Sequence, residues 1–283
     1  MGSVRKRPYR NRKHVIGEFM KSKTILITGA GSGLGMFLAK EYAMLGFKVI
    51  GIDVNENGLM FGAKDFGLLP IVMSVSQASE WERNVEKINS YCDGEIDICI
   101  VNAGILRMGD VMSDMESWDT SVGVNLTGSY LTARFSIPYL FNSKGNIVFI
   151  GSSSSIFSAE KELGYISTKH GLVGMMKSIS LDYGAIGIRS NMVSPGWMRT
   201  AMSDKEMELV MDTKGCTLDE AYDFATAYIP LKRPGMLEEI FNAIYFLSSE
   251  KAGFITGVNL LVDGGSSIVD SGMIGVNSLS KKQ

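Results

Sequence analysis

From residue 24 onward, short runs of β-branched and aliphatic residues alternate with longer amphipathic stretches. The short runs predict strands at residues 24–28, 48–53, 69–74, 96–101, 146–151, 188–193 and 258–262. The longer stretches predict helices at residues 33–45, 78–91, 118–141, 163–183 and 236–248. Alternation of this kind is typical of βαβ units. Because the strands are almost wholly apolar, we expect them to be buried on both faces, in a parallel sheet between two layers of helices.

The pattern predicts one domain. A chain of 283 residues, with 45% hydrophobic and 20% charged residues, has the composition of a globular protein that can bury a full core. It contains no internal repeat, low-complexity segment or linker to a second domain. We therefore expect a single-domain α/β fold over residues 20–266, with a doubly wound parallel sheet of about seven strands flanked by helices. Residues 267–283 are expected to form a C-terminal tail.

Charge is concentrated at the N-terminus, although the formal net charge of the chain is only −2. Six basic residues lie within the first thirteen positions: Arg5, Lys6, Arg7, Arg10, Arg12 and Lys13. A basic arm can bind nucleic acid or act as a targeting signal. However, Gly17-Glu18-Phe19 before Met20 resembles a cloning junction, so residues 1–19 are interpreted as a vector-derived extension. No nucleic-acid partner is therefore expected.

The composition also narrows the classes of function. No run of about 18 uninterrupted apolar residues is present, so no membrane-spanning helix is expected. The three cysteines lack metal-ligand spacing and are expected to be reduced thiols of a cytoplasmic protein. With His14 and His170 as the two histidines, a histidine-based zinc site or a Ser-His-Asp hydrolase is disfavoured. No metal site is predicted.

A glycine-rich turn follows the first predicted strand and opens the first predicted helix, with glycines at 29, 31, 33 and 35. In a Rossmann-type sheet this turn receives a dinucleotide pyrophosphate, because glycines allow close backbone approach and the helix N-terminus offers free N–H groups. Asp53 ends the second predicted strand, where a carboxylate binds ribose hydroxyls and repels a 2′-phosphate. Neither Val54 nor Asn55 is basic, so NAD is predicted over NADP. A plain turn residue is the alternative for Asp53.

Tyr165 and Lys169 are four residues apart and share one face of a predicted helix. An ammonium beside a phenol lowers the pKa of the phenol toward neutral, which suits it to acid/base catalysis. Ser152, thirteen residues before Tyr165, can hydrogen-bond the oxygen that gains or loses the proton, with Ser153 as the alternative. Combined with a dinucleotide, these groups indicate hydride transfer between a nicotinamide and an alcohol carbon.

These motifs, in this order over residues 21–266, resemble those of the short-chain dehydrogenase/reductase family. The resemblance also covers Asn102-Ala103-Gly104, Asn125, Pro195-Gly196 with Thr200, and the final Val262-Asp263-Gly264-Gly265. It implies that Tyr165 is the general acid/base and that Ser152 orients the substrate oxygen. Lys169 is implied to lower the Tyr165 pKa and hold the nicotinamide ribose. Asn125 is implied to hold a water that links Lys169 to solvent.

The resemblance implies a cofactor site along the carboxyl ends of the strands. Its residues are Gly29, Ser32, Gly33, Leu34, Gly35, Asp53, Ser74, Val75, Asn102, Ala103, Gly104, Tyr165, Lys169, Pro195, Gly196 and Thr200. Two positions depart from the family pattern. Ser74 replaces an aspartate that often contacts the adenine, and Gly151 precedes Ser152 where serine is common.

The family places a mobile substrate lid after the Pro195-Gly196 turn, here at about residues 197–229, where we expect two short helices. The predicted substrate contacts are Ser152, Ser154, Phe157, Tyr165, Trp197 and Met202. The lining is mainly apolar, with Arg107 as the nearest candidate anion anchor, so a neutral and fairly hydrophobic secondary alcohol or ketone is predicted. Whether the four methionines at 198, 202, 207 and 211 line the pocket or pack under the lid is left open.

Three functions are consistent with these motifs. The leading one is an NAD(H)-dependent alcohol dehydrogenase or carbonyl reductase. The second is an NADPH-dependent 3-ketoacyl-thioester reductase, against which Asp53 and the acidic Asp182 argue. The third is a catalytically idle nucleotide-binding protein, against which the complete set Asn125, Ser152, Tyr165 and Lys169 argues. The resemblance also implies a homotetramer, or failing that a homodimer.

Overall fold

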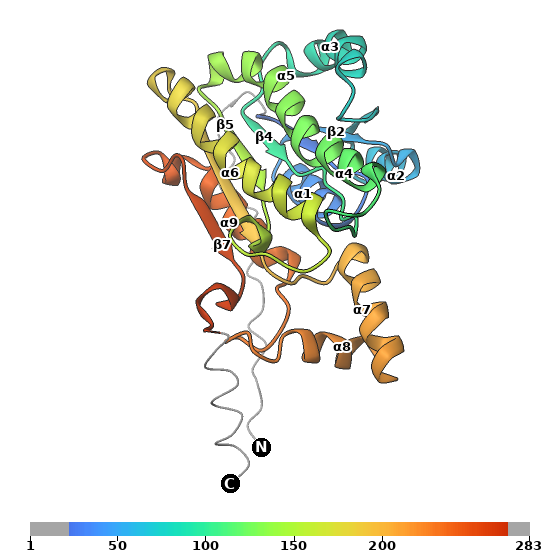
Figure 1. Ribbon diagram of the computed structural model, residues 1–283. Coiled ribbons are helices and arrows are strands. Elements are labelled where there is room, and N and C mark those ends of the chain that lie inside the picture. The colour runs from blue at the N-terminus through green and yellow to red at the C-terminus, as the bar shows by residue number, and fades with distance from the viewer. Residues whose placement is uncertain (1–22, 271–283) are drawn as a thin grey trace, which may run out of the picture.

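The computed structural model describes residues 23–270 and has a seven-stranded parallel sheet at its centre (Figure 1). The strands are β1 Thr24–Thr28, β2 Lys48–Asp53, β3 Leu69–Val72, β4 Ile98–Val101, β5 Asn146–Ile150, β6 Arg189–Pro195 and β7 Asn259–Val262. Their spatial order is β3-β2-β1-β4-β5-β6-β7, and every neighbouring pair is parallel. The predicted single-domain, doubly wound Rossmann-type fold is confirmed. The predicted extension at 1–19 and most of the predicted tail lie outside the described residues.

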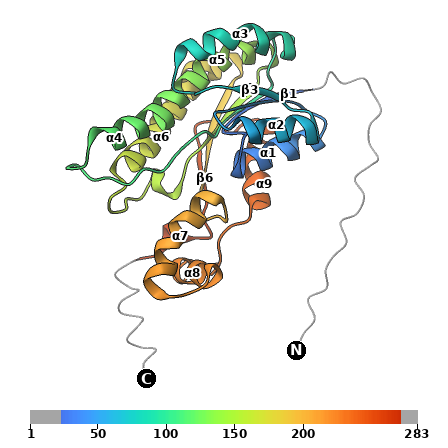
Figure 2. The same ribbon diagram turned by 90° about the vertical axis from the view of Figure 1, so that its right-hand side faces the viewer.

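Helices cover both faces of the sheet (Figure 2). The helices of residues 23–270 are α1 Gly33–Met44, α2 Glu56–Phe66, α3 Ala78–Cys92, α4 Met115–Ser121, α5 Gly128–Ser143, α6 Leu163–Tyr183, α7 Ala201–Lys214, α8 Leu218–Ala225 and α9 Leu237–Ser248, of which α7 and α8 lie apart from the sheet. Alternate residues of a strand point to opposite faces. Thus Ile25 and Ile27 belong to the buried cluster with α1 and α9, whereas Leu26 belongs to the cluster with α3, α5 and α6. No helix of residues 23–270 is long and apolar enough to cross a membrane.

Helix α2 was not predicted from the sequence. Its stretch contains Gly58 and Gly62, and glycine weakens a helix by about 1 kcal/mol relative to alanine. The structure uses both glycines for close packing. A side chain at Gly58 would collide with the carbonyl oxygen of Gly31, and one at Gly62 with Leu68. Asn55 caps the helix by accepting a hydrogen bond from the Gly58 N–H at 3.1 Å. Tertiary contacts and the cap therefore override a weak local pattern.

The helix predicted at 118–141 is not continuous. It begins earlier, with α4, and a π-helical segment at Val122–Thr127 separates α4 from α5. The strands predicted at 69–74 and 96–101 are each two residues shorter, at Leu69–Val72 and Ile98–Val101. Two helices, α7 and α8, lie within residues 197–229 as predicted. They pack on each other around Met207, Ala221 and Tyr222, beyond the carboxyl end of β6 (Figure 2).

Candidate active site

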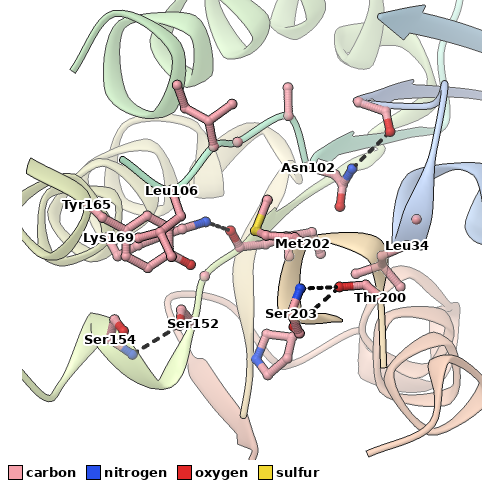
Figure 3. A pocket seen from close by; sticks show the side chains of 18 of the residues that line it. Leu34, Asn102, Leu106, Ser152, Ser154, Tyr165, Lys169, Thr200, Met202 and Ser203 are labelled. Carbon is pink, nitrogen blue, oxygen red and sulfur yellow. Dashed lines mark hydrogen bonds between the residues drawn. The ribbon is translucent and has the colours of Figure 1, made fainter. Parts of the chain in front are cut away.

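A cleft of about 670 Å³ lies along the carboxyl ends of β1 to β6 (Figure 3). Its walls are the segments that follow these strands, together with the first turns of α6 and α7. The strand order reverses between β1 and β4, and open α/β sheets bind ligands at such a reversal. Every site residue predicted from the sequence lines this cleft, with the exception of Asn125.

The glycine turn at one end of the cleft is tightly packed except at Gly33. That residue has a φ of +50°, and a side chain there would meet no atom within 4 Å. A side chain at Gly35 would collide with the carbonyl oxygen of Gly29 and with Nδ2 of Asn102. Ser32, which precedes α1, makes no side-chain capping hydrogen bond, and the first turn of α1 holds no acidic residue. The helix N-terminus therefore fits a phosphate, with free N–H groups and a favourable dipole.

Asp53 is fixed at the end of β2 by two backbone donors. The Gly31 N–H donates to its Oδ2 at 2.8 Å, and the Asn55 N–H donates to its Oδ1 at 2.9 Å. The carboxylate thus holds the turn together and also lines the cleft. The two interpretations of Asp53, as a turn residue and as a cofactor ligand, are compatible with each other.

Polar contacts shape the floor of the cleft beside the glycine turn. Nδ2 of Asn102 donates to the carbonyl oxygen of Thr28 at 2.9 Å, so that the amide ties β4 to β1. The Thr28 hydroxyl oxygen in turn accepts from the N–H groups of Asn102 and Ala103, each at 3.1 Å. Further along, the N–H of Ser74 donates to Oε2 of Glu80 at 2.7 Å. These hydrogen bonds hold the segments after β3 and β4 in place beside the cleft.

Ser152, Tyr165 and Lys169 converge at the other end of the cleft (Figure 3). Nζ of Lys169 donates to the carbonyl oxygen of Ile150 at 2.9 Å and lies 5.5 Å from the centre of the Tyr165 ring. The Ser152 hydroxyl oxygen accepts from the Ser154 N–H at 3.1 Å, which fixes its position. A phenol, a hydroxyl and a buried ammonium in one cleft can together move a proton to or from a ligand oxygen.

The pKa of Tyr165 departs from the sequence prediction. The pKa of Tyr165 is raised to about 12, mainly by burial; the hydrogen bond with Ser152 opposes this rise, and the charges of Glu206 and Glu162 add to it. Burial also lowers the pKa of Lys169 to about 8. The predicted lowering of the Tyr165 pKa is therefore wrong for this structure, because desolvation disfavours the charged form of both groups. Tyr165 accordingly holds its proton at neutral pH.

Asn125 lies behind the cleft, in the π-helical segment, and is 1% exposed. Its Oδ1 accepts from the Ile105 N–H at 2.8 Å, and its Nδ2 donates to the Ile105 carbonyl oxygen at 2.9 Å and to the Thr168 hydroxyl at 3.2 Å. The amide thus fixes the loop after β4. A side chain at Gly104 would lie 3.5 Å from Oδ1 of Asn125 and 3.7 Å from Nζ of Lys169. A water link between Asn125 and Lys169 stays a prediction.

The chain is similar to known proteins in both sequence and structure. The sequence profile described as "Enoyl-(Acyl carrier protein) reductase" matches residues 29–267. A solved oxidoreductase from Burkholderia thailandensis, described as a member of the short chain dehydrogenase/reductase family, shares 26% identity and a TM-score of 0.80, over 92% of this chain and 98% of its own. The chain belongs to the short-chain dehydrogenase/reductase family.

Other members of the family are also similar. Protein MoaE of Klebsiella aerogenes is 42% identical over 88% of this chain and 97% of its own length. The structure of a 3-ketoacyl-(acyl-carrier-protein) reductase from Brucella melitensis, complexed with NADH, has a TM-score of 0.76 and 29% identity, over 87% of this chain and 98% of that one. The Brucella melitensis structure shares the fold that positions the cleft.

In this short-chain dehydrogenase/reductase, apolar side chains line part of the cleft. Phe157, Trp197 and Met202 line it as predicted. The four methionines left open by the sequence divide between two roles. Met198 and Met202 line the cleft, whereas Met207 and Met211 pack inside the α7–α8 pair. Arg107 is exposed and lies off the cleft, so it is no anion anchor for the cleft.

Sequence reasoning missed two acidic residues that line this end of the cleft, Glu162 and Glu206. Glu162 immediately precedes α6, three residues before Tyr165. Glu206 lies on α7, four residues after Met202. Residues four apart share a helix face. The prediction that Met202 lines the pocket therefore also implies that Glu206 lines it. Burial, and to a smaller extent the charge of Glu162, raise the pKa of Glu206 to about 7.

Trp197 lines the cleft and also packs against the core of the α7–α8 pair. Trp197→Ala is therefore expected to raise KM about tenfold or more for bulky apolar substrates, because about 1.5–3 kcal/mol of apolar contact is lost. Small substrates, which do not reach the ring, should be affected little. Steady-state kinetics on a size series measure the difference. Met211→Ala is the control, because Met211 packs in the same core without lining the cleft. An equal rise of KM for all substrates in both variants would show that Trp197 acts by packing alone.

Proposed function

We propose that this protein is an NAD(H)-dependent oxidoreductase that interconverts a secondary alcohol and a ketone. The observation that carries the proposal is the convergence of Ser152, Tyr165 and Lys169 at one end of a cleft whose other end holds an uncapped helix N-terminus and Asp53. When bound, the nicotinamide supplies or accepts a hydride. The proposed partner is a small molecule, and no nucleic acid or membrane is required.

The residues at the cleft then have distinct tasks. In ketone reduction, the Tyr165 hydroxyl donates a proton to the carbonyl oxygen, and in alcohol oxidation the Tyr165 phenolate takes a proton from the alcohol. Ser152, held by the Ser154 N–H, hydrogen-bonds the same substrate oxygen. The Lys169 ammonium stabilises the phenolate that forms when the proton leaves Tyr165. Apolar side chains around the reacting carbon exclude water.

The predicted cofactor preference is tested at Asp53. With this carboxylate in place, kcat/KM for NAD(H) should exceed that for NADP(H) by about 30- to 150-fold, as expected for one unfavourable contact of about 2–3 kcal/mol. Asp53→Ser should reduce the ratio, although it also removes the acceptors of the Gly31 and Asn55 N–H groups. Asp53→Asn separates these effects, because it removes the charge but retains an acceptor. A parent enzyme that prefers NADP(H) would contradict the assignment.

A panel of secondary alcohols and ketones of increasing size, assayed with NAD(H) by the absorbance of the reduced cofactor, tests the reaction itself. Turnover of at least one member, lost in variants of the cleft, is the expected result. Tight NADH binding without turnover of any member would instead support a catalytically idle nucleotide-binding protein.

A second candidate is an NADPH-dependent 3-ketoacyl-thioester reductase. The reaction is favoured by the name of the Brucella melitensis structure, a 3-ketoacyl-(acyl-carrier-protein) reductase, although that structure is a complex with NADH. Asp53 at the cofactor end and the exposed Asp182 on α6 argue against NADPH and an acidic carrier protein. Acetoacetyl-coenzyme A with NADPH is the direct assay. Faster reduction of this thioester than of any simple ketone would establish the second candidate. A cytoplasmic location and a homotetramer or homodimer stay predictions.

A further inference from the structure

Two carboxylates of the cleft have no partner among the residues that the structure describes. Glu206, from α7, and Glu162, at the start of α6, both line the cleft and are partly buried. Neither side chain forms a hydrogen bond or an ion pair with any residue of 23–270. Both are close enough to Tyr165 for their charges to raise its pKa. The two side chains therefore share the Tyr165 end of the cleft.

The charge balance of the cleft is strongly acidic. Its lining includes one cationic side chain, Lys169, which donates to the carbonyl oxygen of Ile150. The acidic side chains are Asp53, Glu162 and Glu206, of which Asp53 lies at the glycine turn. Two carboxylates that are partly desolvated and repel each other are unfavourable in the free protein. A cation placed between them would relieve both the desolvation and the repulsion.

We propose that Glu206 and Glu162 select a substrate that carries a protonated amine beside its carbinol or carbonyl carbon. This inference rests on the proposed function. In the oxidation of such an amino alcohol, the carbinol C–H bond breaks and its hydride reduces NAD+. Tyr165 first releases its own proton to solvent, and its phenolate then takes the hydroxyl proton as the C=O bond forms. The carbon is oxidised by two electrons, the amine keeps its charge, and the products are an amino ketone, NADH and a proton.

Other substrate classes fit less well. An anionic substrate would meet two carboxylates with no free cation in the described lining. A polyol needs donors and acceptors around several hydroxyl groups, whereas Phe157, Trp197 and Met202 present an apolar wall. The body of the substrate should therefore be apolar, as predicted from the sequence, but the neutral substrate predicted there is replaced by a cation. Contacts between like charges, and buried charges left without a partner, strongly disfavour the binding of a wrong substrate.

Three alcohols of similar size test the inference at about pH 8, where Glu206 is ionised. They are 2-amino-1-phenylethanol, 1-phenyl-1-propanol and mandelate, whose benzylic carbinol carbon carries an aminomethyl cation, an ethyl group and a carboxylate, respectively. We expect kcat/KM for the amine to exceed that for the neutral alcohol at least about tenfold, with mandelate the slowest. Equal rates for the amine and the neutral alcohol, or a preference for mandelate, would overturn the inference.

Variants connect this preference to the carboxylates. Glu206→Gln should reduce the amine-to-neutral ratio of kcat/KM about tenfold, and Glu162→Gln should reduce it in the same direction. Glu208→Gln is the control, since Glu208 lies on α7, is exposed and lies off the cleft, yet its removal changes the net charge equally. An unchanged ratio in Glu206→Gln, or an equal fall in Glu208→Gln, would refute a direct contact.

Binding separates this inference from the proposed function. Phenethylamine and 2-phenylethanol lack a benzylic hydroxyl group, and their affinity for the NAD+-loaded protein is measured by calorimetry. Phenethylamine should bind at least about tenfold more tightly, and Glu206→Gln should remove the difference. If this holds but no alcohol is oxidised, the proposed reaction fails while the cation site stands. If neutral alcohols are oxidised without any amine preference in rate or binding, the reaction stands and the cation site fails.

Discussion

Tyr165→Phe is expected to reduce kcat for ketone reduction at least about 100-fold, since general acid catalysis typically contributes about 10²- to 10⁴-fold. The ring stays in place and only the proton donor is lost. Burial raises the pKa of Tyr165 to about 12, so the parent carries this proton throughout the neutral range. Affinity for NADH should change less than about threefold, because the phenol oxygen is one contact among many. Steady-state rates and fluorescence titration with NADH measure the two effects.

Tyr183→Phe is the matched control for this variant. Tyr183 lies at the end of the same helix, α6, and its ring packs 6.3 Å from the ring of Phe141, away from the cleft. The control should retain the rate of the parent. A Tyr165→Phe enzyme that kept more than about a third of the parent rate would show that another group protonates the substrate oxygen.

The sequence predicts most of this fold because its strands are simple to recognise. Buried parallel strands are continuous apolar runs, and in β1 all five residues are buried. The glycine turn and Asp53 are recognisable because they occur at fixed places relative to these strands. Helix α2 was missed for the opposite reason. Its stability depends on the close packing of Gly58 and Gly62, which are unfavourable residues when only local propensity is considered.

The sequence predicts which residues form the candidate site better than it predicts their pKa values and the charge of the cleft. Spacing along a helix places Tyr165 and Lys169 on one face, but it does not give their burial. Desolvation therefore reversed the predicted direction of the Tyr165 pKa shift. The acidic character of the cleft was missed because Glu206 comes from α7, far from Tyr165 in sequence. The spacing from Met202 indicates that Glu206 faces the pocket, but its approach to Glu162 beside Tyr165 depends on tertiary packing.

Lys169→Met is expected to reduce kcat/KM for ketone reduction about as strongly as Tyr165→Phe, at least about 100-fold. The phenolate left by proton donation then lacks its nearest positive charge, and the proposed contact to the nicotinamide ribose is lost. Lys169→Arg should keep part of the activity, because it retains the charge but changes the geometry.

Lys169→Met should lose activity without a comparable change in stability. Lys169 is 5% exposed, and burial lowers its pKa to about 8, so the fold holds an ammonium at a free-energy cost below that pH. This cost disappears in the parent as pH rises from about 8 toward the unfolded pKa, and it is absent from the variant at every pH. The lost hydrogen bond to the Ile150 carbonyl oxygen opposes this gain, so the melting temperature should change little.

The pH dependence of the rate provides the decisive measurement for Lys169. In the parent, kcat/KM for ketone reduction should fall above about pH 8, because the ammonium that stabilises the phenolate loses its proton there. Lys169→Met should lack this fall, since it has no proton to lose. Glu206 titrates near pH 7 in the same cleft, so Glu206→Gln is measured in parallel and should keep the fall above pH 8. If the fall persists in Lys169→Met and is lost in Glu206→Gln, the titrating group is the carboxylate, and Lys169 does not govern proton transfer by Tyr165.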